Sequence, residues 1–156
     1  MNFKKFSLYI LVIVFVFFLG FLLINKSNDS KKIFDIKNTD YVKIGGAIIK
    51  VDLALTPTEQ ENGLSLRDSL KDDEGMLFIF DNLGKYPFWM KDMSFPIDII
   101  WIGEDFLIVY IKKNALPESY PEIFYPQKDS KYVLEVNSQF SEKKNLKEGD
   151  KVEFLP

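Results

Sequence analysis

The amino-acid sequence predicts a mostly β protein: a compact antiparallel β-sandwich or barrel-like domain with one short helix, preceded by a single N-terminal transmembrane helix. The first observation is that residues 75–102 gather aromatic and β-branched residues in three short runs separated by Asp, Asn, Gly and Pro, which is typical of consecutive buried strands. The second is a single strong helix-start signal at Thr56. The third is an uncharged, almost wholly apolar stretch over residues 6–24.

The apolar stretch at residues 6–24 is predicted to be the membrane-spanning part of an uncleaved signal anchor over residues 1–24. As a helix it would rise about 28 Å, close to the thickness of a bilayer's hydrocarbon core. Lys4 and Lys5 precede it, which keeps the N-terminus cytoplasmic and places the C-terminal domain on the extracytoplasmic side. A cleaved signal peptide has a shorter apolar core and a small-x-small exit, and a buried core helix is the other alternative. We therefore expect a single-pass protein of the cell membrane.

Residues 25–40 are predicted to be a polar juxtamembrane linker, and residues 41–156 the β-rich globular domain. Tyr41–Ile44 begins the first strand, and Gly45-Gly46 is a hairpin-type turn. Apolar and other residues alternate over 49–55, which predicts a half-buried strand.

A short helix follows this strand. Thr56 is expected as its N-cap, Pro57 at its first position and Glu59 as the residue that closes a capping box. Gly63 is the expected stop. Residues 64–74 are expected to form a loop or one more helical turn.

Most of the remaining domain is predicted to be strands joined by turns. The expected strands are residues 76–80, 88–91, 96–102, 106–112, 132–136 and 152–154. Five residues are expected at the centre of the core: Met76, Phe78, Phe80, Ile97 and Ile99. Several short strands with one short helix are typical of a sandwich or barrel.

Composition excludes several kinds of site. The chain has no Cys and no His, so disulfides, thiol nucleophiles, Ser-His-Asp triads and imidazole metal ligands are absent. The net charge is −3 without a basic stripe, which argues against a nucleic-acid partner. The acidic run Asp68, Asp72, Asp73 and Glu74 lacks the spacing and the glycine of a calcium-binding loop, so we predict a solvated loop, no metal and no cofactor.

Six blocks occur in a specific order: Thr-x-x-Glu-x-x-x-Gly-Leu-x-x-Arg at residues 56–67, Gly-Met-Leu-Phe at 75–78, Phe-Trp-Met-Lys at 88–91, Pro-Ile-Asp-Ile at 96–99, Val-Leu-Glu-Val at 133–136 and Gly-Asp at 149–150. Over roughly residues 41–155 the chain thereby resembles the family called domain of unknown function 192. The resemblance implies a compact β-rich fold, often in exported or membrane-anchored proteins, and no established activity. The chain departs from the common family pattern at Ser65, where Met is usual, and at Asp92 and Met93, where Asn and Thr are usual.

Four residues are candidates for binding a ligand: Arg67, Trp89, Asp98 and Glu135. Asp98 and Glu135 lie within apolar runs and should face away from their flanking residues. In a structural interpretation the carboxylates face solvent, or Arg67 pairs with one of them, and Trp89 packs in the core. In a functional interpretation all four converge on one cleft, where Trp89 stacks on a sugar or an aromatic group. No catalytic residue is assigned.

Two functions remain open, so the sequence does not decide whether the protein is an enzyme. The favoured one is a non-enzymatic binding or accessory module, tethered to the membrane through residues 6–24, for an envelope glycan, another envelope component or a secreted protein. The alternative is a carboxylate-based hydrolase of envelope polysaccharide, in which Asp98 and Glu135 divide the acid and base roles. A cleft shared by both carboxylates would favour the hydrolase.

Overall fold

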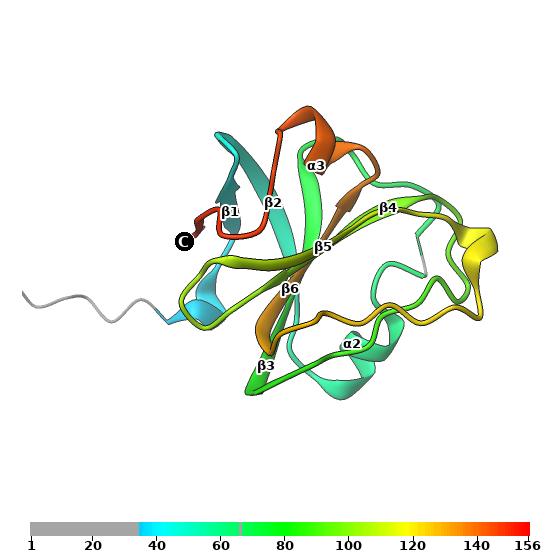
Figure 1. Cartoon of the computed structure of the whole chain (residues 1–156), viewed down its shortest axis with the longest axis horizontal. Helices are drawn as coiled ribbons and strands as arrows, with labels where there is room; N and C mark the ends of the chain where they lie inside the picture. The colour runs from blue at the N-terminus through cyan, green and yellow to red at the C-terminus, as the bar shows by residue number, and fades with distance from the viewer. Residues whose placement is uncertain (1–34, 66) are drawn as a thin grey trace, which may run out of the picture. The chain divides into compact units, whose positions relative to one another are not determined.

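Seven strands form one curled sheet in the order β5-β4-β6-β3-β2-β1-β7 (Figure 1). The computed structural model describes residues 35–65 and 67–156. The strands are β1 (Tyr41–Ile44), β2 (Ala47–Ala54), β3 (Glu74–Gly84), β4 (Ile97–Ile102), β5 (Ile108–Ala115), β6 (Ser130–Asn137) and β7 (Val152–Leu155). The helices are η1 (Ile36–Asn38), α2 (Pro57–Asn62), η2 (Pro117–Ser119) and α3 (Phe140–Lys143).

The two outer strands of the sheet approach each other and nearly close it into a barrel. The Ile108 N–H donates to the Asp150 carbonyl at 2.9 Å, and the Gly149 N–H donates to the Ile108 carbonyl at 2.8 Å. The Val152 N–H donates to the Phe106 carbonyl at 2.8 Å. These bonds join the start of β5 to the start of β7, so the backbone groups there are paired rather than left as open edges.

One pair of neighbouring strands departs from the expected antiparallel arrangement. Strands β2 and β3 run parallel, with Val51 opposite Gly75 and Leu53 opposite Leu77. The chain passes between them through α2 and the loop that follows, and parallel neighbours need such a crossover. The expectation of a mostly β, barrel-like fold is confirmed, but a purely antiparallel sheet is wrong.

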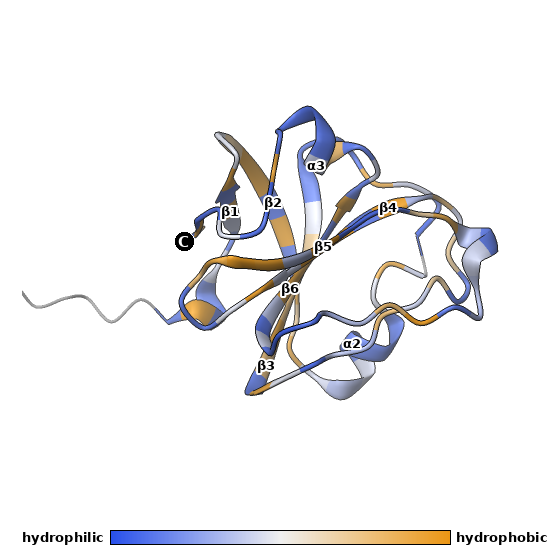
Figure 2. Ribbon diagram, viewed as in Figure 1, coloured by the Kyte–Doolittle hydropathy of each residue, from blue (hydrophilic) through white to orange (hydrophobic). Residues whose placement is uncertain are grey.

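The short helix α2 forms as its capping residues predict. The Thr56 hydroxyl accepts a hydrogen bond from the Glu59 N–H, and the Glu59 carboxylate accepts one from the Thr56 N–H. The helix has no buried residue, and both α2 and α3 have hydrophilic colours in Figure 2, whereas the hydrophobic colours follow the strands. Capping rather than packing therefore defines α2.

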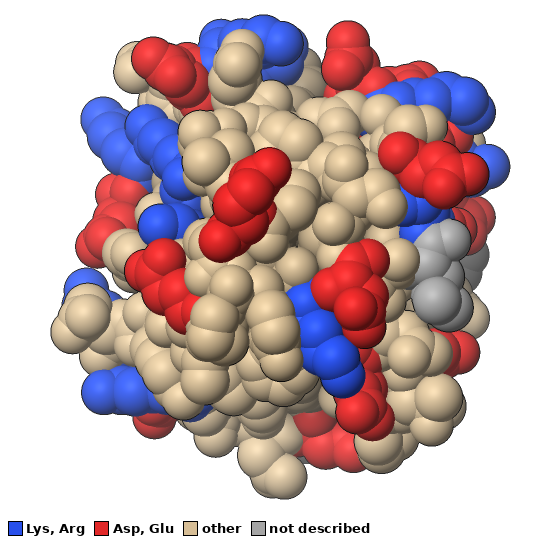
Figure 3. All heavy atoms as spheres, turned by 90° about the vertical axis from the view of Figure 1, so that its right-hand side faces the viewer, with Lys and Arg blue, Asp and Glu red and all other residues tan. Residues whose placement is uncertain are grey.

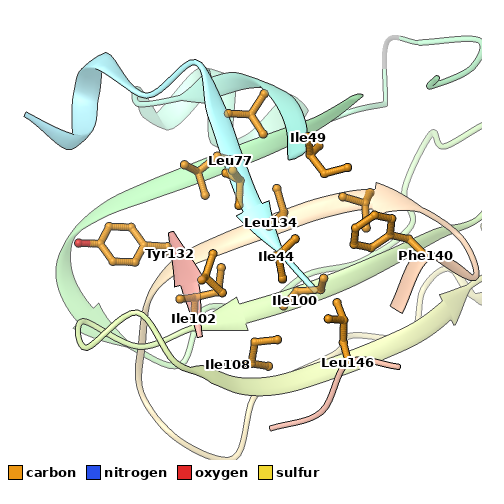
Figure 4. Packing of buried hydrophobic residues seen from close by; sticks show 14 of the residues in the cluster. Ile44, Ile49, Leu77, Ile100, Ile102, Ile108, Tyr132, Leu134, Phe140 and Leu146 are labelled. Carbon is orange, nitrogen blue, oxygen red and sulfur yellow. The ribbon is translucent and has the colours of Figure 1, made fainter. Parts of the chain in front are cut away.

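Both faces of the central strands are covered, which produces two hydrophobic clusters. The inner core receives residues from all seven strands and from the α3 region: Val42, Ile44, Ile49, Val51, Leu77, Ile79, Ile100, Ile102, Ile108, Tyr132, Leu134, Val136, Phe140, Leu146 and Val152 (Figure 4). The outer core lies on the other face of β3, β4 and β6: Ala54, Leu64, Leu70, Met76, Phe78, Phe88, Met90, Ile97, Ile99, Trp101, Ala115, Phe124 and Val133. Of the five expected core residues, four are buried in the outer core, and Phe80 is partly buried against it.

One predicted strand does not form, and the predicted anchor lies outside the described residues. Residues 88–91 are not a strand, because the pairing there is a single bridge between Phe88 and Phe124. The expected anchor at residues 6–24 lies outside the described residues, as does the expected linker up to residue 34. Within the described ranges, no helix has the length and apolar composition needed to cross a membrane.

Candidate functional site

A pocket of about 270 Å³ opens over the outer core. Its walls come from α2 with the turn after it, from β3, from residues 86–93 and from β6. The lining residues are Gln60, Glu61, Asn62, Gly63, Leu64, Ser65, Phe78, Phe80, Tyr86, Pro87, Phe88, Trp89, Lys91, Met93 and Glu135. Two of the four predicted site residues, Trp89 and Glu135, are therefore brought together here.

Two acidic side chains, Glu61 of α2 and Glu135 of β6, are among the described lining residues, and Glu135 is almost completely buried. It lies on β6 opposite Met76 of β3 and Ile99 of β4, and only 4% of its surface is exposed. Within the described residues, its Oε2 atom has no hydrogen-bond partner. A buried polar atom without a partner is costly to a fold, so this oxygen needs an explanation.

Burial also changes the protonation of this carboxyl. It raises the pKa of Glu135 from its ordinary 4.5 to about 8, although the Arg67 guanidinium nearby acts in the opposite direction. The apolar surroundings thus outweigh the positive charge. At pH 7 the carboxyl is mostly protonated, and it can then both donate and accept a hydrogen bond. Strongly shifted groups inside pockets are characteristic of functional sites.

Aromatic rings form the walls around the carboxyl. The Phe80 and Tyr86 rings are stacked, with centroids 3.5 Å apart, and the Phe78 and Phe88 rings meet edge to face at 4.9 Å. The Tyr86 hydroxyl donates to the Asn82 carbonyl at 2.6 Å. These contacts hold the rings in fixed orientations, so the walls are formed before a ligand arrives.

Trp89 lies at the rim of the pocket rather than in the core. It is 37% exposed, whereas its neighbours Phe88 and Met90 are 8% and 1% exposed. Phe88 and Met90 belong to the outer core, whereas Trp89 between them lies at the surface. The alternation leaves Trp89 free to contact a ligand.

Asp98 lies on the opposite face of the sheet from Glu135. In the pairing of β4 with β6, Asp98 lies opposite Val136 and Ile99 lies opposite Glu135. Directly paired residues point to the same face of a sheet and successive residues to opposite faces, so Asp98 and Glu135 point to opposite faces. The expectation that either carboxylate faces solvent is wrong, because Asp98 and Glu135 are 0% and 4% exposed. The two carboxylates do not form one cleft.

The Asp98 carboxylate has a structural role. Its Oδ1 atom accepts hydrogen bonds from the backbone N–H groups of Asn114 at 2.8 Å and Gln139 at 3.3 Å. Its Oδ2 atom accepts one from the Ser141 N–H at 2.8 Å. It therefore ties the end of β5 to the first residues of α3, and three charge-assisted bonds offset the cost of its burial.

Arg67 pairs with a different carboxylate from the two expected. Its guanidinium forms an ion pair with Asp52 on β2, so the predicted clamp on Asp98 or Glu135 is wrong. The side chains of Arg67 and Asp52 are 31% and 59% exposed. Arg67 is not among the described residues that line the pocket. Its positive charge nevertheless acts on the site, because it lowers the pKa of Glu135.

The sequence-based reasoning missed Gly63 and the aromatic walls as parts of the site. Gly63 was expected only as a helix stop, but a side-chain Cβ there would lie 3.5 Å from Glu135 Oε2 and 3.3 Å from the Phe78 ring. Its φ of +50° is also strained for other residues. The sequence shows a glycine at the end of the helix, but no local pattern shows that it lies against Glu135 of the 133–136 block.

The acidic loop does not assemble into a metal site. Within the described residues, no group of three or more acidic side chains is placed to hold a metal ion. Asp72 and Asp73 instead line a second pocket of about 300 Å³ between β2 and α3. Its described lining contains none of the four predicted site residues.

Solved structures and a family model match this chain. A protein of unknown function from Novosphingobium aromaticivorans DSM 12444 is 33% identical, with a TM-score of 0.69, over 72% of this chain and 83% of its own. A protein from Sinorhizobium meliloti 1021, described as a candidate transcription regulator, is 32% identical, with a TM-score of 0.68, over 73% and 92%. The model of the family DUF192, described as "Uncharacterized ACR", matches residues 40–154. No protein with a curated description matches.

Proposed function

The chain belongs to the DUF192 family, described as "Uncharacterized ACR", and we propose that its β-rich domain binds a glycan of the cell envelope in the aromatic pocket. Family membership assigns no activity, so the proposal rests on the pocket. In this proposal residues 6–24 anchor the domain to the membrane and the pocket faces the extracytoplasmic side.

The observation that carries the proposal is that Glu135, whose Oε2 atom has no hydrogen-bond partner in the described part of the chain, lines a pocket with aromatic walls. A protein that only needed to be stable would gain by an apolar residue at this position. A group that is costly to the fold, lies in a pocket and has a strongly raised pKa is a candidate for contact with a ligand. The pocket's volume of about 270 Å³ fits one compact ring or substituent rather than a large molecule.

The chemistry of the walls favours a sugar. A sugar ring presents a face of C–H groups and an edge of polar groups, and aromatic side chains combine an apolar surface with a fixed shape. Trp89, 37% exposed at the rim, can stack on such a ring while the pocket receives one of its substituents. The donor and acceptor groups of Glu135 then meet the polar edge.

Binding is better supported than the alternative of polysaccharide hydrolysis. Glycoside cleavage generally needs two carboxyl groups on either side of the bond to be broken. Asp98 and Glu135 lie on opposite faces of the sheet, and Asp98 is already bound to three backbone N–H groups. The two-carboxylate mechanism considered for this chain therefore has no matching geometry.

The neighbour described as a candidate transcription regulator would suggest DNA as a partner. The charge of this chain does not favour that partner. Its net charge is −3, and Figure 3 shows acidic and basic residues interspersed over a mostly uncharged face. Binding to a phosphate backbone is favoured by a concentrated basic surface.

Binding can be tested by sedimentation with insoluble cell-wall polysaccharide, using the full-length chain in a mild non-ionic detergent. We expect Trp89→Ala to lower the association constant about tenfold, which corresponds to about 1.4 kcal/mol. The matched control is Tyr41→Ala on β1, because Tyr41 is 39% exposed and belongs to another part of the sheet. Equal binding by wild type and Trp89→Ala would contradict the proposal, as would failure of the wild-type chain to sediment.

The anchor can be tested separately. Protease added to spheroplasts should remove the β-rich domain and leave a short membrane-bound fragment, because the domain is proposed to lie outside the cytoplasm. Complete protection of the domain would contradict the topology. A mature N-terminus near residue 28 would show cleavage instead of anchoring.

A further inference from the structure

The second pocket, of about 300 Å³, lies between β2 and α3 (Figure 1). Its described lining comes from four segments: the start of β2, the loop before β3, the end of β6, and α3 with the residue after it. It shares no described lining residue with the aromatic pocket. A ligand of the second pocket would therefore bind independently of one in the first.

The lining of this pocket carries charges of both signs. Asp72 and Asp73 lie in the loop before β3, and both are exposed. Lys143 is the last residue of α3, Lys144 follows it, and both are exposed as well. Within the described residues, none of these four side chains takes part in an ion pair. Opposite charges that line one pocket without contacting each other suit a ligand that carries both charges.

Apolar surface lies in the same pocket. Ile49 and Phe140 are buried in the inner core, at 1% and 7% exposure, and both belong to the pocket lining. Ile48, also in the lining, is 58% exposed, which is the largest value among the described large hydrophobic side chains. A ligand with an apolar side chain would remove part of the Ile48 surface from water, which favours binding.

Hydrogen bonds fix the acidic wall of the pocket to the sheet. The Lys50 N–H on β2 donates to the Asp73 carbonyl at 2.8 Å. The Asn137 amide at the end of β6 donates to the Leu70 carbonyl at 2.7 Å. The loop that carries the two aspartates is thus bonded to strands on both of its sides, so this wall is formed before a ligand arrives.

The basic wall is fixed by Asp98 and by a close contact with a turn. The buried Asp98 carboxylate accepts hydrogen bonds from the Gln139 and Ser141 N–H groups, which hold the start of α3. A Cβ at Gly45, in the turn between β1 and β2, would lie 3.0 Å from the Lys144 Cβ. The missing side chain therefore lets this turn lie against the end of α3.

The separation of the charges favours a peptide over a free amino acid. In a free amino acid the ammonium and carboxylate groups are bound to the same carbon atom. Each further residue of a peptide adds up to about 3.8 Å between the two groups. Because the acidic and basic side chains of the pocket do not contact each other, a ligand with well-separated charges can reach both.

We propose that the second pocket binds a short apolar peptide whose two termini are free. The ammonium group of the peptide contacts Asp72 and Asp73. Its carboxylate contacts Lys143 and Lys144, and an apolar side chain covers Ile48. This site goes beyond the proposed glycan site and does not depend on it.

Peptides with blocked termini test the proposal. The full-length chain in detergent is titrated by calorimetry with alanyl-leucine, N-acetyl-alanyl-leucine, alanyl-leucine amide, glycylglycine and free leucine. We expect alanyl-leucine to bind most tightly. Each blocked terminus should weaken binding about fivefold, the upper end for a partly solvated ion pair. Glycylglycine should also bind more weakly, because it has no side chain to cover Ile48.

Variants of the basic wall test which end of the peptide it contacts. Lys143→Gln combined with Lys144→Gln should weaken alanyl-leucine about fivefold but leave the affinity for alanyl-leucine amide unchanged, because the amide has no carboxylate to lose a partner. A merely structural effect would weaken both ligands equally. The control is Lys113→Gln combined with Lys151→Gln, which makes the same change in net charge at exposed positions outside the described lining.

Variants of the acidic wall should show the opposite selectivity. Asp72→Asn combined with Asp73→Asn should weaken alanyl-leucine about fivefold and leave N-acetyl-alanyl-leucine unchanged, because this ligand has no ammonium group. The control is Glu104→Gln combined with Glu122→Gln, two exposed carboxylates outside the described lining.

Each remaining outcome would overturn the proposal. Equal affinity for the free and the blocked peptides would show that the charges do not contact the termini. Tighter binding of free leucine than of alanyl-leucine would assign the pocket to an amino acid instead of a peptide. Failure of all five ligands to bind would leave the four charges as ordinary solvated side chains.

Discussion

Replacing Glu135 by Gln should change how the stability of the protein depends on pH. In the folded protein the pKa of this carboxyl is raised to about 8 from its ordinary 4.5, so the folded state binds the proton more tightly than the unfolded chain. Between these two pH values the folded state holds a proton that the unfolded chain has released. The wild-type free energy of unfolding therefore falls as pH rises through this window and levels off above about pH 8.

The size of the effect follows from the size of the shift. One pKa unit corresponds to about 1.36 kcal/mol, so a rise from 4.5 to about 8 costs about 5 kcal/mol once the carboxyl is fully ionised. Between pH 5 and pH 9 the wild type should lose about 4 kcal/mol from this group. Glu135→Gln cannot ionise, so its curve should lack this slope. The amide is still a buried polar group and costs about 1–3 kcal/mol at all pH values.

The measurement is urea unfolding of the full-length chain in detergent, followed by tryptophan fluorescence at several pH values from 5 to 9. The wild-type carboxyl at pH 5 and the amide of the variant are both neutral buried polar groups, so the two proteins should have similar stability at pH 5. At pH 9 the variant should be the more stable, so the two curves should diverge as pH rises. Glu104→Gln serves as a control for the loss of one carboxylate at an exposed position. Parallel curves for the wild type and Glu135→Gln would refute the inference that Glu135 is buried as a neutral acid.

Three further substitutions separate structural from functional roles. Asp98→Ala should lower the free energy of unfolding by about 3–5 kcal/mol, because three backbone N–H groups, that of Ser141 buried and those of Asn114 and Gln139 partly buried, lose their acceptor; a loss below about 1 kcal/mol in urea unfolding would contradict this role. Arg67→Ala should cost less than about 1 kcal/mol, since its ion pair with Asp52 is largely exposed, and it should raise the pKa of Glu135 further. A marked loss of stability, or a lower Glu135 pKa in an NMR titration, would show that Arg67 acts differently. Phe78→Ala should cost about 3–5 kcal/mol, because this ring is 1% exposed; an unchanged melting temperature would contradict its place in the outer core.

Local signals allowed most of the elements to be predicted. The helix α2 starts at Pro57 and ends before Gly63, as its capping box and glycine indicate. Most strands lie where β-branched and aromatic runs occur, because such residues fit a pleated, buried surface. The strand expected at residues 88–91 does not form, because the aromatic residues there pack in the outer core and against the pocket without a continuous partner strand.

Local signals could not predict whether neighbouring strands run parallel or antiparallel, or which strands are buried on both faces. The alternation in β2 is the same for a parallel or an antiparallel neighbour, so the parallel pairing with β3 depends on the path taken by α2. All six residues of β4 are buried, so this strand has no alternation of buried and exposed residues. Its pattern therefore could not show that the face of the sheet that carries Asp98 is buried. For the same reason the sequence could place Asp98 and Glu135 within strands but could not show that they lie on opposite faces.

The two separate hydrophobic clusters have a consequence for how this family can diverge. Residues of the inner core hold the curled sheet together, whereas the pocket is built on the outer face from α2, the turn after it and residues 86–93. Mutations in those segments can alter the shape of the pocket without disturbing the interior of the sheet. Ser65 and Met93, for example, both line the pocket. Related proteins can therefore keep the interior of the sheet while the shape of the outer pocket changes.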